Sequence, residues 1–235
     1  MHIMRANTVS PNQGAVNHKN IMYGIEARGS VVTLECPGLE ASPAVALGTE
    51  VKDVANAGGP VCIRRFCSND RASLFAAVRE SITELCQWMV WCHPQYSADE
   101  VSAFIAGCDA AWTSGERYSF AIYDRLDGAI LGSVGLSAID RRHQLANLGY
   151  WVRTGRTRRG VATAAVDLAA RFAFTQTNLQ RLEMIIPVEN EASLRVAKRT
   201  GATREGTLRS RILLNGSPHD AALFSLVRSD VVLIQ

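Results

Sequence analysis

The segment YWVRTGRTRRGVATAA, residues 150–165, decides how the rest of the chain is interpreted. Its first three residues are strand formers. The next eight, residues 153–160, contain four arginines, two glycines and no apolar side chain. After them, apolar residues recur at helical spacing and predict a helix over residues 161–174. The segment therefore predicts a strand, a basic loop and a helix in direct succession.

The junction of this loop with the helix has the properties of a pyrophosphate site. Gly160 lets a ligand approach the backbone closely. The first N–H groups of a helix have no partner inside it and lie at its positive end. The arginines beside them add full charges and forked donors. We interpret the junction as an anion site, the alternative being that these arginines are only solvated. The pattern fits neither G-x-x-x-x-G-K-[ST] nor G-x-G-x-x-G.

The motif TRRGVA, residues 157–162, resembles the acyl-coenzyme A loop of the GNAT superfamily of N-acetyltransferases, whose signature is [Q/R]-x-x-G-x-[G/A]. Gly160 and Ala162 match this signature, whereas Thr157 stands where Gln or Arg is usual. The run NLQRLEMIIPVENEASLRVAKRTGATREGTLR, residues 178–209, resembles the RimJ/RimL branch, the N-terminal acetyltransferases of ribosomal proteins. The resemblance extends over residues 61–227 and leaves out the first sixty residues.

Composition narrows the class of protein. The chain has 235 residues, of which 47% are hydrophobic and 20% charged, as in an ordinary globular protein. We find no membrane-spanning apolar run and no signal-peptide core, and therefore expect a cytoplasmic protein without a membrane partner. The net charge of +3 and the single short basic cluster disfavour nucleic acid as a partner. The six cysteines form no Cys-x-x-Cys pair and predict free thiols rather than a metal site.

We expect two unequal parts. Residues 1–59 predict a disordered or loosely packed N-terminal extension, in which residues 30–36 could form a short strand and residues 55–60 a linker. A start codon placed too far upstream would look the same, and a small specificity domain is the other alternative. Residues 60–235 are the expected N-acetyltransferase domain.

The order of predicted elements gives the fold class. A strand over residues 61–66 precedes two short helices with a break near Ser81, and Ser97 with Glu100 predicts a capping box on the next helix. Three antiparallel strands follow, over residues 118–123, 129–139 and 145–152. After the basic loop come a helix over residues 161–174, a buried strand over residues 181–186 and a short helix over residues 190–201 that is capped by Asn190. A hairpin of residues 207–214 and 220–227 ends the order. This is a mixed α/β (α+β) order. The resemblance implies a GNAT-type fold with a mostly antiparallel sheet, a splayed strand pair and helices on both faces.

The resemblance also implies acetyl-CoA as the acyl donor, with no metal. The pantetheine arm would enter beside the strand that ends the segment, next to the main chain of Trp151, Val152 and Arg153. We expect the nucleotide end to contact the following loop and helix residues: Arg153, Arg158, Arg159, Gly160, Val161, Ala162 and Thr163.

For the leaving thiolate, the resemblance points to Asn190 and Ser193. Helix capping alone explains an asparagine at 190, whereas it explains Ser193 less well. Tyr150 is the candidate acid. No base is assigned, because the strand before the loop has Asn147 and no carboxylate. The ionisable residues that remain open as bases are Glu183, Glu189, Asp220, His143 and His219. Removal of the proton through water, or an amine that is already neutral, would need no such residue.

The aromatic segment CQWMVWCHPQYS, residues 86–97, has two interpretations of equal weight. It can be a satellite core cluster, or it can form a wall of the acceptor pocket with Trp88, Trp91 and Tyr96.

The predicted reaction is acetyl transfer to a primary amine, with a protein N-terminal amine as one acceptor. The alternatives are a small amine (an amino acid, a polyamine or an antibiotic) and a non-catalytic acyl-CoA-binding regulatory module. Homodimers are common in the family, and the sequence leaves this open.

Overall fold

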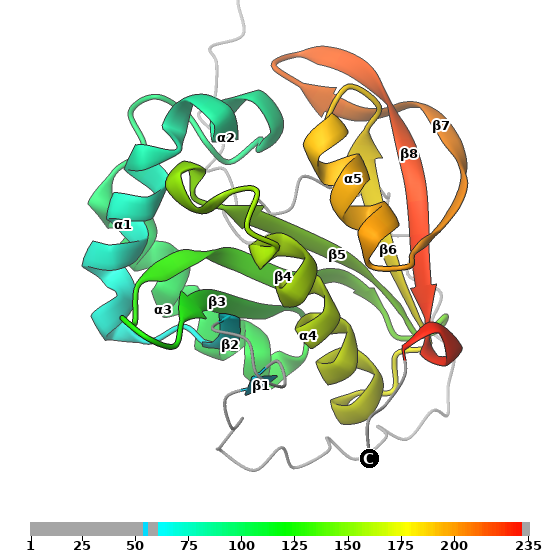
Figure 1. Cartoon of the computed structure of the whole chain (residues 1–235), viewed down its shortest axis with the longest axis horizontal. Helices are drawn as coiled ribbons and strands as arrows, with labels where there is room; N and C mark the ends of the chain where they lie inside the picture. The colour runs from blue at the N-terminus through cyan, green and yellow to red at the C-terminus, as the bar shows by residue number, and fades with distance from the viewer. Residues whose placement is uncertain (1–53, 56–60, 232–235) are drawn as a thin grey trace, which may run out of the picture.

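An eight-stranded sheet is the frame of the chain, in the order β1-β2-β3-β4-β5-β6-β8-β7. The computed structural model describes residues 54–55 and 61–231 (Figure 1). Neighbouring strands are antiparallel except β5 and β6, which are parallel. The strands are β1 (Val54–Ala55), β2 (Val61–Arg65), β3 (Tyr118–Asp124), β4 (Ile130–Asp140), β5 (Leu145–Val152), β6 (Arg181–Pro187), β7 (Thr203–Leu214) and β8 (Ser217–Val227). The predicted mixed, mostly antiparallel sheet is confirmed.

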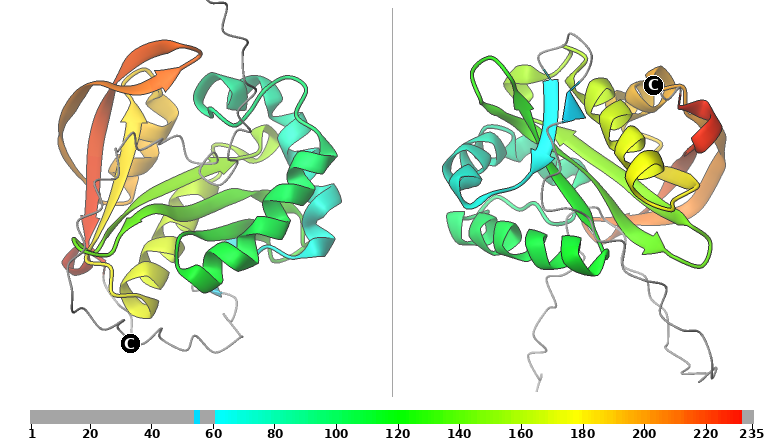
Figure 2. Two further views of the ribbon diagram at one scale, coloured as in Figure 1. Left: turned by 180° about the vertical axis from the view of Figure 1, so that it is seen from behind. Right: turned by 90° about the horizontal axis from the view of Figure 1, so that it is seen from below.

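Helices cover both faces of this sheet (Figure 2). On one face α1 lies against β4 and α3 against β3, while α4 crosses β2, β4 and β5 on the other, with α5 beside it. The α-helices are α1 (Arg71–Glu80), α2 (Ile82–Trp88), α3 (Ala98–Ser114), α4 (Val161–Gln176) and α5 (Glu191–Arg199), and short 3-10 helices are η2 (Ser68–Asp70), η3 (Thr154–Arg156) and η4 (Arg228–Asp230).

Local sequence signals set the helix limits. The break between α1 and α2 falls at Ser81, as predicted. The capping box at the start of α3 is also confirmed, since Glu100 N–H donates to Ser97 Oγ and Ser97 N–H donates to the Glu100 carboxylate. Gly115 ends α3 in the left-handed conformation, at φ 65°.

Successive side chains of a strand pack on opposite faces of the sheet. Phe120 and Ile122 of β3 pack in the cluster that contains α4, whereas Ala121 packs in the cluster that contains α1 and α3. Because both faces are covered, consecutive residues of β3 are buried. The sheet is therefore a rigid platform up to the ends of its central strands.

The sheet begins earlier than the sequence predicts. Val54 and Ala55 were expected in the extension and linker, but they form β1 and pair with Ile63 and Cys62 of β2. The strand expected over residues 30–36 lies outside the described residues. Within the described residues there are five free cysteines, of which Cys67 is exposed. No described helix is long and apolar enough to cross a membrane.

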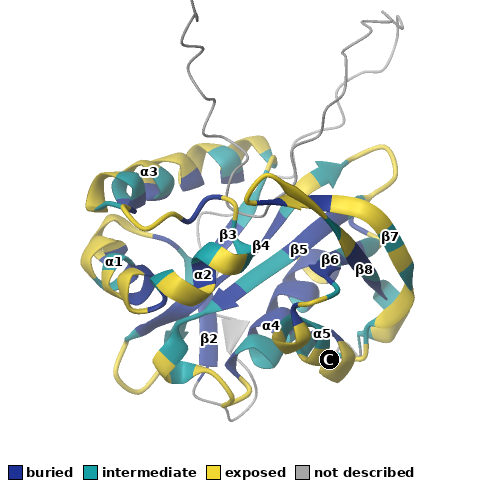
Figure 3. Ribbon diagram, turned by 90° about the horizontal axis from the view of Figure 1, so that it is seen from above, coloured by how far each residue is buried: buried dark blue, intermediate teal, exposed yellow. Residues whose placement is uncertain are grey.

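The β7–β8 hairpin is longer than predicted and irregular. Its turn is the expected one, with Asn215 at φ 49° and Gly216 at φ 81°. β7 is bulged between Arg204 and Gly206 and again between Leu208 and Ile212. Among the described strands it pairs with β8 alone, and it is exposed along most of its length (Figure 3). The buried residues of β7 are Ile212 and Leu214, at the end of the strand next to the turn.

Candidate functional site

β5 and β6 are paired at one end and separate at the other. Residues 145–147 of β5 pair in parallel with residues 181–183 of β6. Beyond Asn147, β4 is the only strand among the described residues that pairs with β5, and β6 continues beside β8. The strands diverge from this point (Figure 1), as the resemblance to GNAT proteins implied. Main-chain groups on one edge of β5 are thereby freed for a ligand.

A pocket occupies the gap between the diverging strands. Its walls come from β5 and β6, from α2 with the turn after it, from the start of α5 and from β7. The lining residues are Trp88, Met89, Val90, Asn147, Leu148, Gly149, Tyr150, Trp151, Met184, Ile185, Ile186, Pro187, Asn190, Ser193, Ile212 and Leu214. The structure thus brings Tyr150, Trp151, Asn190 and Ser193 into one cavity, although they are distributed over more than forty positions of sequence.

The start of α5 presents two polar side chains to this pocket. Asn190 caps the helix, its Oδ1 accepting from Ser193 N–H at 3.1 Å. The Asn190 amide nitrogen and the Ser193 hydroxyl make no hydrogen bond with any other residue that the structure describes, so both remain available to a ligand. Capping therefore accounts for only one of the hydrogen-bonding groups of Asn190 and for none of the Ser193 hydroxyl.

Tyr150 links the end of β5 to this helix. Its hydroxyl donates to the Ser193 main-chain oxygen at 3.1 Å. Burial raises the pKa of Tyr150 well above its ordinary value. The phenol is therefore protonated at neutral pH, as an acid must be.

The three aromatic candidates separate into two groups. Trp88 lines the pocket and packs against the small cluster of Ile212, Leu214 and Ala221. Trp91 and Tyr96 are 7% exposed each and pack edge to face, with ring centroids 5.2 Å apart, in the core cluster between α1 and α3. For these two residues the geometry is that of the satellite core cluster, and a contact with the acceptor stays a prediction.

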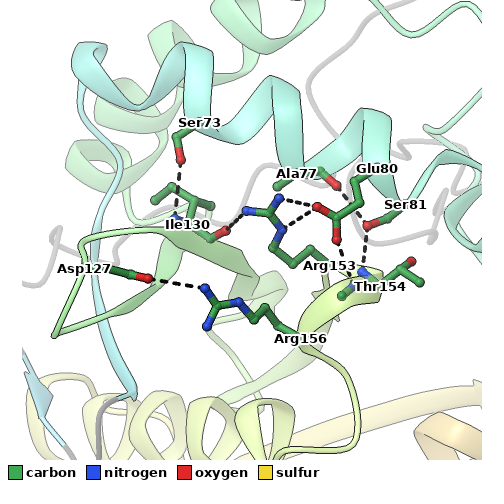
Figure 4. Close-up of polar contacts among 10 residues, drawn as sticks. Ser73, Ala77, Glu80, Ser81, Asp127, Ile130, Arg153, Thr154 and Arg156 are labelled. Atoms are coloured by element: carbon green, nitrogen blue, oxygen red, sulfur yellow. Dashed lines mark hydrogen bonds and ion pairs between the residues drawn. The ribbon is translucent and has the colours of Figure 1, made fainter.

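The first half of the basic loop is attached to the α1–α2 junction (Figure 4). The Arg153 guanidinium pairs with Glu80, its Nε lying 3.0 Å from Oε2, and also donates to Ile130 O. Gly155 N–H donates to the other Glu80 oxygen at 2.8 Å. The Arg153 guanidinium, and then the Gly155 N–H, hold the pKa of Glu80 below its ordinary value. Thr154 N–H donates to Ser81 Oγ at 2.9 Å.

Arg156 is also occupied by acidic side chains. Its guanidinium lies 3.2 Å from Asp127 Oδ2 and 3.5 Å from Asp124 Oδ2, at the β3–β4 turn. Two of the four arginines in the loop thus have carboxylate partners. The expected contact of the Arg153 side chain with a cofactor stays a prediction, and its guanidinium already has an anionic partner inside the protein.

The second half of the loop is different. Arg158 and Arg159 are exposed and form no ion pair or hydrogen bond with any described residue. Gly160 adopts φ 77° just before α4 and has open space around it. Ala164 N–H is the first to bond back, to Gly160 O. Among the described residues we find no acceptor for the N–H groups of residues 160–163, so full and partial positive charges face outward together.

Each candidate base already has a polar partner. Glu183 pairs with Arg181 at 2.8 Å, at the closed end of the β5–β6 pair. The Asp220 carboxylate accepts from Ser210 N–H at 2.8 Å. Of the histidines, His143 bonds to Asp140 at 2.8 Å and His219 lies 3.4 Å from Glu189. None of these five candidates is among the residues that line the pocket.

Sequence reasoning missed two groups of site residues. Glu80 and Ser81, which anchor the loop, lie more than seventy positions before it, and no local pattern connects them. Met184, Ile186 and Leu214 were expected only as strand residues. Residues 212–214 of β7 are apolar throughout (ILL), so the sequence pattern does not show that Ile212 and Leu214 face inward and Leu213 outward.

Comparison with known proteins gives the family of the chain. Residues 61–203 match the family model described as the acetyltransferase (GNAT) domain. A Bacillus subtilis protein provisionally named ribosomal N-acetyltransferase YdaF is 32% identical over 104 residues, 44% of this chain and 57% of its own length. Escherichia coli spermidine N(1)-acetyltransferase is 32% identical over 95 residues, 40% of this chain and 51% of its own. The chain thus spans little more than half the length of these curated relatives.

Solved structures share the fold. Mycobacterium smegmatis RimJ in complex with CoA-disulfide superposes with a TM-score of 0.69 at 24% identity, covering 74% of this chain and 85% of that one. The ribosomal-protein-S5-alanine acetyltransferase of Vibrio fischeri gives a TM-score of 0.65 at 20% identity, covering 74% and 96%. With the family model covering more than half of its length, this chain belongs to the GNAT acetyltransferase family.

Proposed function

We propose that this chain transfers an acetyl group from acetyl-CoA to a primary amine, and that the amine is a protein N-terminus. One observation carries the proposal: unpartnered donors at the start of α4 lie directly after the strand whose open edge borders a pocket that ends at Ser193. An elongated ligand with an anionic end and a neutral arm matches that order of features. Free thiols among the described residues fit the predicted cytoplasmic location.

The residues present fit the anionic end of acetyl-CoA. Arg158, Arg159 and the N–H groups of residues 160–163 offer charged and neutral donors on one side of the loop. Gly160 keeps the helix start open, because no atom lies within 4 Å of where a Cβ would be. The loop does not have to form on binding, since Glu80 and Ser81 already anchor its first half. The donors are therefore preorganised for phosphate oxygens.

The residues around the pocket fit the other end of the molecule. Bound acetyl-CoA supplies a thioester that is reactive toward a neutral amine. The free edge of β5 offers the main-chain donor of Val152 to an amide-containing arm and to a developing oxyanion. Arg153 N–H already donates to Leu131 O of β4, and Trp151, two residues earlier, has its main-chain groups on that same β4 edge. We assign to Asn190 the contact with the arm and to the Ser193 hydroxyl the donation of a proton or hydrogen bond to the departing sulfur.

Tyr150 supports this arrangement in two ways. Its hydrogen bond to the Ser193 carbonyl fixes the start of α5 against β5. Its raised pKa keeps a proton available in the pocket, so it is the second candidate acid. For the amine itself, the described lining residues include no carboxylate or imidazole. We therefore propose that the amine enters neutral or loses its proton to water.

A protein N-terminus is the acceptor we favour. The YdaF name and the names of the two solved structures concern ribosomal acetylation or the RimJ type, and an α-amine has a lower pKa than a lysine, about 7.7–8.0 against about 10.4. Near neutral pH, a sizeable fraction of such amines is thus already neutral. This matters in a pocket whose described lining offers no base.

The test is acetyl transfer to a peptide with a free N-terminus, compared with the same peptide carrying a blocked N-terminus and one lysine. Mass spectrometry should show one added acetyl group on the first peptide only. Ser193→Ala should lower kcat by about a hundredfold if Ser193 assists the leaving group, with unchanged acetyl-CoA affinity. Ser114→Ala, on the exposed end of α3, is the matched control and should behave as the wild type. Equal kcat in Ser193→Ala and the wild type would remove Ser193 from the chemistry.

A second function is favoured by the pocket lining. Since no carboxylate or imidazole is among the described lining residues, the chain could bind acyl-CoA as a regulatory module without turnover. This alternative predicts saturable acetyl-CoA binding and no acetylation of peptides, spermidine or amino acids. Any acetyl-CoA-dependent acetylation that Ser193→Ala reduces would exclude it.

A further inference from the structure

The walls of the pocket differ in polarity. Asn190 and Ser193 lie at the start of α5, where we place the reacting thioester. Two other walls, from α2 with its following turn and from the end of β7, are apolar. They consist of Trp88, Met89, Val90, Ile212 and Leu214.

The β7 wall is built by strand alternation. Ile212 and Leu214 face inward and are 8% and 5% exposed, whereas Leu213 between them faces outward and is 61% exposed. The inward pair packs with Ala221 of β8 and receives the Trp88 ring from α2. Trp88 therefore lies across the gap between α2 and the hairpin.

Charges of both signs surround the β7 wall. Arg209 and Arg211 are exposed on the same strand, next to the inward pair, and neither has an acidic partner among the described residues. Asp220 lies opposite them and bonds to Ser210 N–H, and Glu189 lies 3.4 Å from His219, the β8 partner of Ile212. The apolar side chains that line the wall, rather than its surrounding charge, therefore distinguish one acceptor from another.

We infer that the acceptor carries an apolar group next to its amine, which for a protein N-terminus means a first residue with a hydrophobic side chain. This rests on the proposed function and specifies its substrate. The amine then reaches Ser193 while the apolar group packs against Trp88, Ile212 and Leu214. Such packing removes apolar surface from water and favours the matching substrate.

The test uses peptides that differ only in the first residue, which is Leu, Met, Ser, Asp or Lys, together with spermidine. The inference predicts that kcat/KM is at least about tenfold higher for Leu or Met than for Asp, Lys or spermidine. A flat profile, or a preference for Lys or spermidine, overturns the inference while leaving acetyl transfer intact. No acetylation of any probe, with acetyl-CoA still bound, overturns the proposed function and this inference together.

Two neighbouring substitutions locate the effect. Ile212→Ser changes the inward face, whereas Leu213→Ser changes the outward face of the same strand by the same chemistry. The first should reduce the Leu-over-Asp preference by about tenfold, and the second should leave it within twofold of the wild type. Trp88→Leu gives an independent variant should Ile212→Ser fail to fold. Equal preference in all three variants and the wild type would contradict the assignment.

Discussion

The two halves of the loop between β5 and α4 have similar sequences and opposite surroundings. Arg153 and Arg156 are bound to Glu80, Asp124 and Asp127. Arg158 and Arg159, only a few residues later, have no partner among the described residues. The main-chain N–H groups differ in the same way. Those of Thr154 and Gly155 are hydrogen-bonded to side chains, whereas those of residues 160–163 have no acceptor among the described residues.

The difference assigns a different task to each half. The first half fixes the loop to α1 and α2, and the second half holds donors ready for an external anion. Fixing the first half lowers the entropy that binding has to overcome, which is the advantage of preorganisation. Substitutions in the first half should therefore change folding stability, and substitutions in the second half should change ligand affinity.

The largest effect on stability is expected from Glu80→Ala. Its loss removes the carboxylate partner of the Arg153 guanidinium, which keeps only its bond to Ile130 O, and the acceptor of the Gly155 N–H. This should lower the free energy of unfolding by about 2 kcal/mol. Urea unfolding measures this. Glu84→Ala, an exposed glutamate on α2, is the control and should stay within about 0.5 kcal/mol of the wild type. If both variants are equally stable, the anchor has been misassigned.

Ser81→Ala should have the next largest effect. The Ser81 hydroxyl is buried, donates to Ala77 O at 2.9 Å and accepts from Thr154 N–H. Leaving that N–H unsatisfied should cost about 1–1.5 kcal/mol in urea unfolding. Ser102→Ala removes the same kind of helix bond, to Ala98 O, without a loop partner. Ser102→Ala should therefore be the less destabilising of the two, and the reverse order would refute the role of Ser81.

Acid should reduce the contribution of Glu80. Because Arg153 lowers the folded-state pKa of Glu80 below its ordinary 4.5, the carboxylate stabilises the fold fully above that value. The contribution is lost as the pH falls below 4.5 through the folded-state pKa. The stability difference between wild type and Glu80→Gln should accordingly shrink from pH 6 to pH 3, values spanning that range. A constant difference in urea unfolding across these pH values would contradict the ion pair.

Arg156→Ala should have the smallest effect. Its ion pairs with Asp127 and Asp124 lie at the surface, where solvent screens them, so we expect the smallest loss of unfolding free energy among these variants. Added salt should reduce this loss further. A loss as large as that of Glu80→Ala would show that the two arginines of the first half are equivalent anchors.

Much of the fold follows from local sequence. The break at Ser81, the capping box at Ser97 and the turn at Asn215 each depend on a few adjacent residues, and each was predicted correctly. The alternation of β3 and the helical period of α4 likewise define which faces are buried. Short-range chemistry suffices in these places because the partners are only one to four positions apart.

The site depended on contacts that local patterns do not encode. Four arginines in one loop look alike in sequence, and only the distant Glu80 and the β3–β4 turn distinguish the bound pair from the free pair. The same holds for Trp88 and Trp91, since the pocket borders one and the core encloses the other. β7 was predicted too short because its bulges interrupt the alternation of period two.

The most direct test of the division is calorimetric titration of acetyl-CoA into the wild type, an Arg158→Ala/Arg159→Ala variant and an Arg142→Ala/Arg209→Ala control. Both variants lose two exposed arginines, but only the first loses the free donors of the loop. The dissociation constant should rise at least about tenfold in the first and stay within about twofold in the control. Equal affinity in all three proteins, or no binding by the folded wild type, would contradict the account.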